Sequence, residues 1–276
     1  KKIYKKLYFI NINSLFEYGI KFQLGSVSSL ITEALMRVLI SRFGNISEIP
    51  YYEMARRLCD QLRILFASAA TPIVPIIAGQ ISKEENKEEN FKIYSKSNEL
   101  MLFFVVPTYT FVILSSLTIG FFFFNEISPI FSLFILILSL SSIISLSSVI
   151  PFNINLGTGF LKWNVISNIS FLFCMLVLTW PLSKLLGSTG SVLGIGLATI
   201  ISSLVILLPY LNDNNISIKE IFSIRILPLS LMCSSIIMIF SLFLFMIMRE
   251  SITIAFVFTL LIMIPIIFIL IMMHKS

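Results

Sequence analysis

Charged residues are scarce in this 276-residue chain, at 12% of all positions, whereas 57% of the residues are hydrophobic. Runs of about 20 apolar residues recur along the sequence, and this is the length that a helix needs to cross a bilayer. Six of these runs carry no acidic or basic residue between their flanks. Buried helices of a water-soluble domain do not explain such runs. The sequence therefore predicts an all-α fold, a polytopic transmembrane helix bundle.

Residues with metal-binding or catalytic chemistry are few. The three cysteines, Cys59, Cys174 and Cys233, have no metal-ligand spacing, and His274 is the one histidine. Free cysteine inside a span behaves as a small apolar residue, so no disulfide is expected. The sequence has no nucleophile elbow, phosphate loop or nucleotide fingerprint. These absences disfavour a hydrolase and an ATP-driven pump, and no catalytic residue, metal, cofactor or nucleic-acid partner is expected.

Hydropathy along the chain predicts about eight spans. They cover residues 22–41, 62–80, 100–124, 128–150, 163–182, 190–210, 226–247 and 252–273. Connections are short except at residues 81–99, whose charge run is typical of a solvated loop or a helix extension.

The distribution of lysine and arginine predicts the orientation of these spans. Most lysines fall in the segments that the eight spans place on one side, which the positive-inside rule assigns to the cytoplasm together with the C-terminus. The first 21 residues are basic and aromatic and begin without Met. They suit either a cytoplasmic interfacial segment or a linker from a preceding lobe, and the second interpretation is favoured. The expected location is therefore a membrane, with the C-terminus in the cytoplasm.

The region before and within the second span is the exception to the scarcity of charge. Residues 51–80 begin as a charged helix and continue into an apolar one, without an evident break. Arg56, Asp60 and Arg63 lie on one helical face, because they are spaced i, i+4 and i+7. Glu53 can reach Arg56 and Arg57 at i+3 and i+4. Charge at membrane depth costs several kcal/mol unless it faces a partner or a wet cavity.

The preceding span adds a second charged pair, Glu33 and Arg37, at spacing i, i+4. Two interpretations are open. Ion pairing could simply hold the two helices together. Alternatively, a hydrated cationic cavity could receive an anionic head group, because the planar guanidinium binds phosphate bidentately and stays protonated. The second interpretation is favoured, with these candidate residues: Arg37, Arg56, Arg57 and Arg63 for the anion, and Glu33, Glu53 and Asp60 for coupling or charge tuning.

Prolines and glycines predict bends and close packing. Pro72 and Pro75 in the second span, Pro107 in the third and Pro265 in the last can each kink a helix. The segment GSTGSVLGIG contains Gly187, Gly190, Gly194 and Gly196. Such small-residue spacing permits close approach between helices.

Several segments carry a family resemblance by their order and spacing. They are FEYGIKFQLGSVSSLITEALMRVLISRFGNISEIPYYEMARRL, then NFKIYSKSNELMLFFVVP, NINLGTGFLKWNVISNI and GSTGSVLGIGLATIISS. The chain resembles the C-terminal part of bacterial polysaccharide (O-antigen) flippases of the multidrug/oligosaccharidyl-lipid/polysaccharide exporter superfamily. The matching features include Gly19, the Gly44–Asn45 turn, and Tyr52, Ala55 and Leu58 at the start of the charged helix.

The resemblance implies a specific organisation. Residues 22–210 would form a C-terminal lobe of six transmembrane helices, residues 211–276 would add two more, and residues 1–21 would connect to a separate N-terminal lobe. The family flips undecaprenyl-pyrophosphate-linked oligosaccharide units for O-antigen or capsule synthesis. A cationic cavity between lobes, working by alternating access, would then be the substrate site. Implied partners are the lipid-linked oligosaccharide, membrane lipids and, in the same pathway, a glycan polymerase and a chain-length regulator.

Several alternatives stay open from the residues alone. A multidrug exporter of the same superfamily would be expected to have an acidic cavity, whereas these residues carry a net positive charge. A membrane glycan polymerase would be expected to have a large outer loop, which this sequence lacks. A structural scaffold would tolerate exchange of paired charges. The coupling ion, H⁺ or Na⁺, is also undetermined, because burial raises a carboxylate pKa whereas a nearby arginine lowers it.

Overall fold

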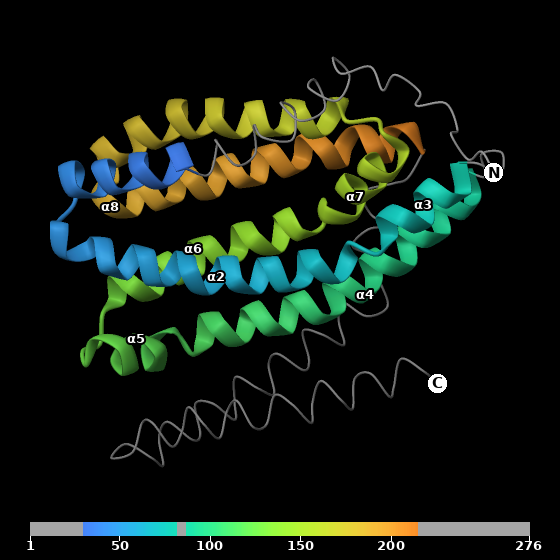
Figure 1. Cartoon of the computed structure of the whole chain (residues 1–276). Coiled ribbons are helices and arrows are strands. Elements are labelled where there is room, and N and C mark those ends of the chain that lie inside the picture. The colour runs from blue at the N-terminus through green and yellow to red at the C-terminus, as the bar shows by residue number, and fades with distance from the viewer. Residues whose placement is uncertain (1–29, 82–86, 215–276) are drawn as a thin grey trace, which may run out of the picture.

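The computed structural model describes residues 30–81 and 87–214. Every regular element in this part of the chain is helical, as the sequence predicts. The elements are a helix at residues 30–43, η1 (Ile46–Glu48), α2 (Ile49–Ala70), α3 (Ile73–Ile81), α4 (Lys87–Leu114), α5 (Ser116–Phe124), α6 (Pro129–Leu146), α7 (Val149–Thr158) and α8 (Lys162–Asp213). They lie roughly side by side as one elongated bundle (Figure 1).

The long helices agree with a membrane protein. Four helical stretches of the described residues are long and apolar enough to cross a bilayer: Ile46–Ile77, Tyr94–Leu114, Pro129–Thr158 and Lys162–Asp213. The last of these holds two predicted spans, 163–182 and 190–210, because α8 reverses direction at Gly187, whose φ of 65° and ψ of −138° are not helical. The predicted spans at 226–247 and 252–273 lie outside the described residues.

The helix boundaries correct the predicted spans in three places. The second span continues from the charged turns before it, as predicted, since α2 begins at Ile49 and includes them. It is interrupted, however, because Thr71 and Pro72 form a turn between α2 and α3. The predicted span 100–124 divides at Ser115 into α4 and α5, and the span 128–150 divides after α6 and extends through α7 to Thr158. Hydropathy does not detect such breaks, because one or two Ser, Thr or Pro residues change little in a mean taken over about 19 residues.

The middle of the bundle is α6, which packs against α2, α4, α5 and α8. Its first turn is set by Pro129 and by the Ser128 hydroxyl, which accepts a hydrogen bond from the Phe131 amide at 3.4 Å. Phe131 and Phe134 are fully buried. Inside a bilayer such helices are held together by van der Waals packing of side chains like these, since lipid is as apolar as the protein interior. A well-packed α6 therefore fixes the position of the helices around it.

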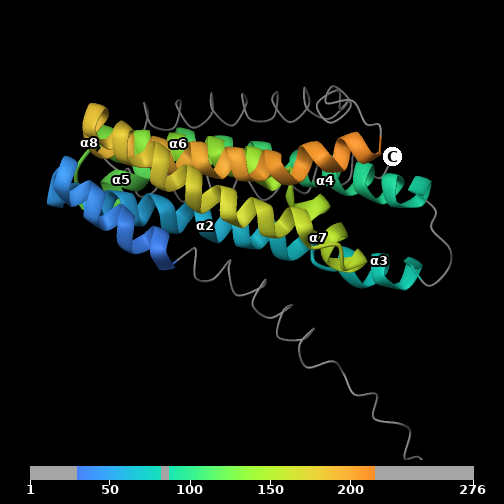
Figure 2. The same ribbon diagram turned by 90° about the horizontal axis from the view of Figure 1, so that it is seen from above.

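Gly187 divides α8 into two arms, residues 162–186 and 188–213. The backbones of these arms pack closely against each other, as the glycine pattern predicts. A Cβ atom on Gly194 would lie 2.5 Å from Thr179 Cα. Ser183 and Ser191 contact each other at 2.7 Å, and the Ser167 hydroxyl donates to the Ser202 carbonyl at 2.7 Å. Figure 2 shows the two arms of α8 lying along the bundle next to α6.

Candidate functional site

The charged residues occupy the first half of α2 and the helix at residues 30–43 that precedes it. Pro50 near the start of α2 suits a first helical turn, where its missing N–H has no intrahelical partner. Tyr52, Ala55 and Cys59 are buried along one side of α2. This apolar side fixes the rotation of the helix, so the charged residues between them face away from the core.

Arg37 connects these two helices. Its guanidinium donates to Glu33 Oε1 at 2.7 Å on the same helix and to Glu53 Oε1 at 2.5 Å on α2. The Glu33–Arg37 pair agrees with the i, i+4 spacing. The pairing predicted for Glu53 with Arg56 and Arg57 is wrong, because the residue 30–43 helix packs beside α2 and supplies Arg37 as the nearer partner. All three side chains are about half exposed.

Arg56 is more buried and has two partners on its own helix. It donates to Asp60 Oδ2 at 3.3 Å and to the Tyr52 hydroxyl at 3.4 Å. The Arg56 side chain is 22% exposed, against 46% for Asp60. Asp60 therefore neutralises the charge of a partly buried arginine. The spacing i, i+4 brings the two side chains to the same face of α2 and allows this pair.

Arg57 and Arg63 differ from the other two arginines. Within residues 30–81 and 87–214, neither has a carboxylate oxygen at ion-pair distance. Both side chains are exposed. Their positive charges are therefore not neutralised by contact with an acid in the described part of the chain, and each is free to bind an anion or a polar ligand.

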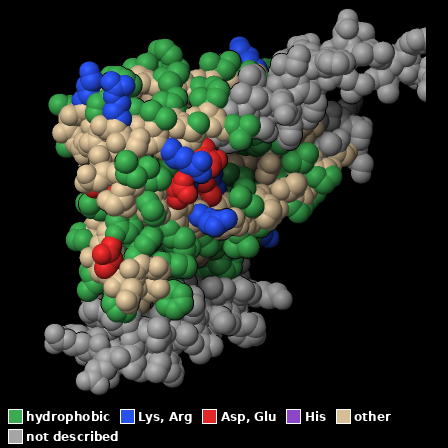
Figure 3. Space-filling model, turned by 60° about the vertical axis from the view of Figure 1, so that its left-hand side comes forward, with side chains coloured by type: hydrophobic (Ala, Val, Ile, Leu, Met, Phe, Trp, Pro, Cys, Tyr) green, Lys and Arg blue, Asp and Glu red, His purple; other side chains and the backbone are tan. Residues whose placement is uncertain are grey.

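The arginines line two cavities instead of one. The first, named here the arginine cavity, has a volume of about 650 Å³ and opens beside α2. Its wall consists of Glu33, Arg37, Pro50, Tyr52, Glu53, Met54, Arg56, Arg57, Asp60, Gln61, Ile64, Phe123 and Phe124. Figure 3 shows basic and acidic side chains gathered in one patch on a face that is otherwise largely apolar.

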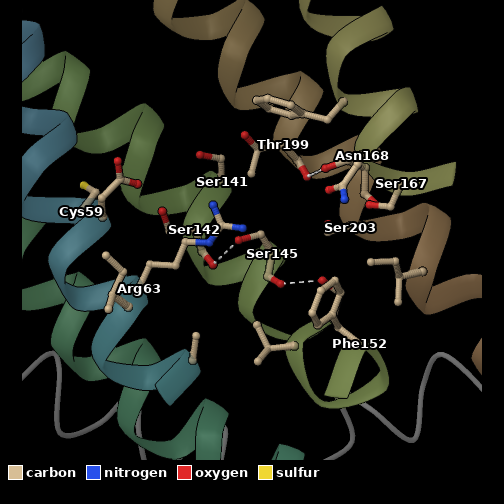
Figure 4. Close-up of a pocket in the computed structure, with 18 of the residues that line it drawn as sticks. Cys59, Arg63, Ser141, Ser142, Ser145, Phe152, Ser167, Asn168, Thr199 and Ser203 are labelled. Carbon is tan, nitrogen blue, oxygen red and sulfur yellow. Dashed lines mark hydrogen bonds between the residues drawn. The ribbon is translucent and has the colours of Figure 1, made fainter. Parts of the chain in front are cut away.

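The second cavity, named here the hydroxyl cavity, has a volume of about 610 Å³ and lies between α2, α6, α7 and both arms of α8. Polar lining comes from Ser141, Ser142, Ser145, Ser148, Asn153, Ser167, Asn168, Thr199, Ser202 and Ser203. Arg63 extends from α2 toward the serines of α6, and Asn168, Thr199 and Ser203 lie on the opposite wall (Figure 4).

This division changes the predicted site. Arg37 and Arg57 line the arginine cavity alone, Arg63 lines the hydroxyl cavity alone, and Arg56 lines both. Arg63 lies about two helical turns along α2 from Arg56, where α6, α7 and α8 form most of the wall. Within the described residues the four arginines therefore line two adjoining cavities, which share Arg56, Asp60 and Ile64.

The serines of α6 are the polar residues that the analysis of the sequence missed. Ser141 and Ser145 are spaced i, i+4 on α6, so they share one helical face, and Ser148 follows in the turn before α7. The recurrence of serine at helical spacing inside an uncharged span was the feature of the sequence that could have indicated a polar cavity. Hydropathy hides it, because serine lowers the mean of a leucine- and isoleucine-rich span only slightly.

Metal binding receives no support from the described residues. They contain no group of three or more histidine, cysteine, aspartate or glutamate side chains placed to hold a metal ion. Cys59 and Cys174 are both free thiols, and Cys233 lies outside the described part.

Comparisons with known proteins agree with the family resemblance. Residues 1–132 match a family model described as polysaccharide biosynthesis protein. No curated protein sequence matches the chain. The fold is similar to that of a solved structure of the lipid II flippase MurJ in an inward closed conformation, with a TM-score of 0.65 and 18% sequence identity. That similarity covers 96% of this chain and 58% of the MurJ chain.

The family match covers the first 132 residues, and the structural similarity shows that the fold is like that of a flippase. The chain is a multi-pass, all-α membrane protein with a fold of this type. It spans a little over half the length of the solved chain that it matches.

Proposed function

We propose that this protein flips lipid-linked oligosaccharide units across the bacterial cytoplasmic membrane, for assembly of a surface polysaccharide such as O-antigen or capsule. The carrier is undecaprenyl pyrophosphate, and the protein acts as a transporter without chemical change to its cargo. The match to a polysaccharide biosynthesis family and the flippase fold support this class of function.

The observation that carries the proposal is the unpaired Arg57 beside Arg37 in an open cavity at the surface of α2. A pyrophosphate has several negatively charged oxygens, and guanidinium groups bind such oxygens through paired hydrogen bonds. Phe123 and Phe124 at the edge of the cavity suit the apolar start of the carrier lipid. The arginine cavity therefore has the chemistry that a lipid-linked phosphate requires.

The carboxylates have a secondary role in this proposal. Glu33 and Glu53 hold Arg37 between the two helices, and Asp60 holds Arg56. Release of one carboxylate from its arginine during alternating access would allow it to take up a coupling ion, H⁺ or Na⁺. The C-terminus lies in the cytoplasm, and a glycan polymerase with its chain-length regulator acts on the flipped product.

An exporter of cationic drugs is less compatible with the site. Three arginines and three carboxylates line the arginine cavity, so their formal charges cancel there, and the excess positive charge over the two cavities comes from Arg63 in the hydroxyl cavity. An anionic head group is favoured over a cationic drug by the guanidinium groups of Arg57 and Arg63, which have no carboxylate partner among the described residues.

The test is complementation of a flippase-deficient strain with the full-length protein, scored by surface glycan. Arg37→Ala, Arg56→Ala, Arg57→Ala and Arg63→Ala are compared with Arg42→Ala, with membrane abundance measured for each. Arg42 is a matched control because it packs over the rings of Phe43 and Trp180 and lines neither cavity. Loss of glycan in the Arg57 variant, with normal display in the Arg42 variant, is expected. Normal display from all four cavity variants would contradict the proposal.

A further inference from the structure

The hydroxyl cavity adjoins the arginine cavity, to which the proposed function assigns the pyrophosphate. Arg56, Asp60 and Ile64 belong to the walls of both cavities. The two spaces are therefore separated by little more than these three side chains on α2. A ligand with one end in the arginine cavity can place its next group in the hydroxyl cavity without leaving this lobe.

The hydroxyl groups of this cavity are arranged as acceptors. Most of them donate their proton to a backbone carbonyl of their own helix: Ser141 to Leu138 at 3.0 Å, Ser145 to Ser142 at 3.2 Å, Ser148 to Ser145 at 2.7 Å, Thr199 to Ile195 at 2.8 Å and Ser203 to Ile200 at 2.7 Å. A hydroxyl oxygen keeps its two lone pairs after donating its proton. These oxygens therefore suit a ligand that carries many O–H donors.

Donors are also present, on other parts of the wall. Arg63 supplies N–H groups from α2 and has no carboxylate partner among the described residues. The Asn168 side chain, which carries two N–H donors, lies on the wall opposite Arg63 (Figure 4). Ligand oxygens in this cavity therefore have donors on two sides.

Apolar groups complete the wall and limit the class of ligand. Phe152, Phe171 and Leu138 line the cavity beside the polar residues. Such a mixture suits the C–H faces and hydroxyl edges of a sugar ring, whereas an acyl chain would leave the polar groups without partners. The volume of about 610 Å³ lies within the range of roughly 300–1,000 Å³ that is typical of small-molecule sites.

We infer that the hydroxyl cavity binds the sugar residues next to the pyrophosphate of the lipid-linked oligosaccharide. This inference rests on the proposed function, in which the arginine cavity binds the pyrophosphate itself. The sugar hydroxyls donate to the oxygens of the α6 and α8 side chains and accept from Arg63 and Asn168. The cargo is thereby recognised inside this lobe by its carbohydrate as well as by its charge.

The test is protection of single cysteines in the purified full-length protein, in a background with Cys59→Ser, Cys174→Ala and Cys233→Ala. Asn168→Cys and Thr199→Cys report on the hydroxyl cavity, and Gln61→Cys reports on the arginine cavity. Leu197→Cys is the control, because Leu197 is exposed on the same arm of α8 as Thr199 and lines neither cavity. Each is labelled with a methanethiosulfonate reagent.

Two probes are added separately: undecaprenyl pyrophosphate without sugar, and the lipid-linked oligosaccharide extracted from cells that make the protein. Both should slow labelling of Gln61→Cys, by about tenfold at a concentration of about ten times the dissociation constant. Only the oligosaccharide form should slow Asn168→Cys and Thr199→Cys, and Leu197→Cys should not change.

The remaining outcomes separate the two proposals. If Gln61→Cys is protected but both hydroxyl-cavity positions react equally with either probe, the sugar stays outside and the inference is wrong, while the proposed function stands. Protection of these positions by the bare pyrophosphate also overturns the inference, since phosphate then occupies the cavity. If neither probe protects Gln61→Cys, the proposed function is contradicted and the inference is lost with it.

Discussion

Arg37 is bound at once to Glu33 on its own helix and to Glu53 on α2, at 2.7 Å and 2.5 Å. The single guanidinium thus joins two helices and neutralises part of the negative charge of two acids. Because all three side chains are about half exposed, the two contacts contribute little to folding, on the order of 0–1 kcal/mol each. This arrangement positions charge at the cavity more than it holds the bundle together.

Exchange of the charges of Arg37 and Glu53 distinguishes a binding function of these residues from a structural one. The double variant Arg37→Glu, Glu53→Arg keeps one opposite-charge contact between the helices but moves the positive charge to α2 and leaves Glu33 beside a new carboxylate. We expect normal membrane abundance and a clear loss of surface glycan. The single variants Arg37→Glu and Glu53→Arg complete a double-mutant cycle, which gives the coupling free energy between the two side chains. Full glycan display from the double variant would instead support a purely structural role for the pair.

Replacement of Arg57 by lysine tests the shape of its head group. Arg57→Lys keeps the charge but loses the planar fork that binds two oxygens of a phosphate. We expect affinity for undecaprenyl pyrophosphate to fall by roughly tenfold, which corresponds to the loss of about one charge-assisted hydrogen bond. Arg57→Gln should bind more weakly still. Unfolding temperatures should not change for either variant, because Arg57 has no carboxylate partner among the described residues. Equal affinity in both variants and the natural protein would exclude Arg57 from the site.

Much of this fold follows from composition and periodicity. Backbone polar groups inside a bilayer must be paired within the protein, so long apolar helices are one of the few structures that can cross it. The all-α class of the described residues and the close packing at Gly190 and Gly194 could be predicted in this way. The breaks at Thr71–Pro72, Ser115 and Ser147–Ser148 could not, except for the first, which Pro72 indicates. They depend on how each helix packs against α6, and that information is not local in the sequence.

The candidate site shows the same division between local and long-range information. The pairs Glu33–Arg37 and Arg56–Asp60 follow from i, i+4 spacing within one helix. The contact between Arg37 and Glu53 depends on how two helices lie beside each other, so spacing alone assigned Glu53 to the wrong arginines. The hydroxyl cavity combines residues from α2, α6, α7 and α8, and no local pattern predicts that they meet.

Gly194 provides a test of the α8 hairpin. A methyl group at this position would lie 2.5 Å from Thr179 Cα and 2.7 Å from its hydroxyl oxygen, so the two arms must separate to accept it. Gly194→Ala should therefore destabilise the protein by about 1–3 kcal/mol, as overpacking commonly does. The change is measured by thermal unfolding in detergent. Gly79→Ala is the matched control, because a Cβ there meets nothing within 4 Å. Equal unfolding temperatures for the two variants would show that the arms are packed less closely than described.

The turn of the same hairpin depends on backbone conformation. Gly187 has φ 65° and ψ −138°, a region that is accessible almost only to glycine. Gly187→Ala should cost about 1–3 kcal/mol for this reason, even though the position is at the end of the bundle. Thermal unfolding again gives the measurement, with Ser188→Ala as the neighbouring substitution at a residue whose conformation is helical. A Gly187→Ala protein as stable as the natural one would contradict the reversal of α8 at this residue.

Serine-to-alanine changes on α6 separate ligand binding from helix packing. Ser145 and Ser148 line the hydroxyl cavity, whereas Ser147 does not; all three are buried, and each donates to the carbonyl three residues earlier. Loss of one acceptor to a sugar hydroxyl corresponds to about 1 kcal/mol, or roughly fivefold in affinity. We therefore expect Ser145→Ala and Ser148→Ala each to weaken binding of the lipid-linked oligosaccharide about fivefold.

The same two variants should bind bare undecaprenyl pyrophosphate as the natural protein does, because the serines lie outside the arginine cavity. Ser147→Ala removes the same atom from the same helix and should change neither affinity. Folding should be little affected in all three, since a serine bonded back to its own helix contributes little to helix stability. If Ser147→Ala weakened oligosaccharide binding as much as Ser145→Ala, the effect would arise from the packing of α6, and the serines would have no direct contact with the sugar.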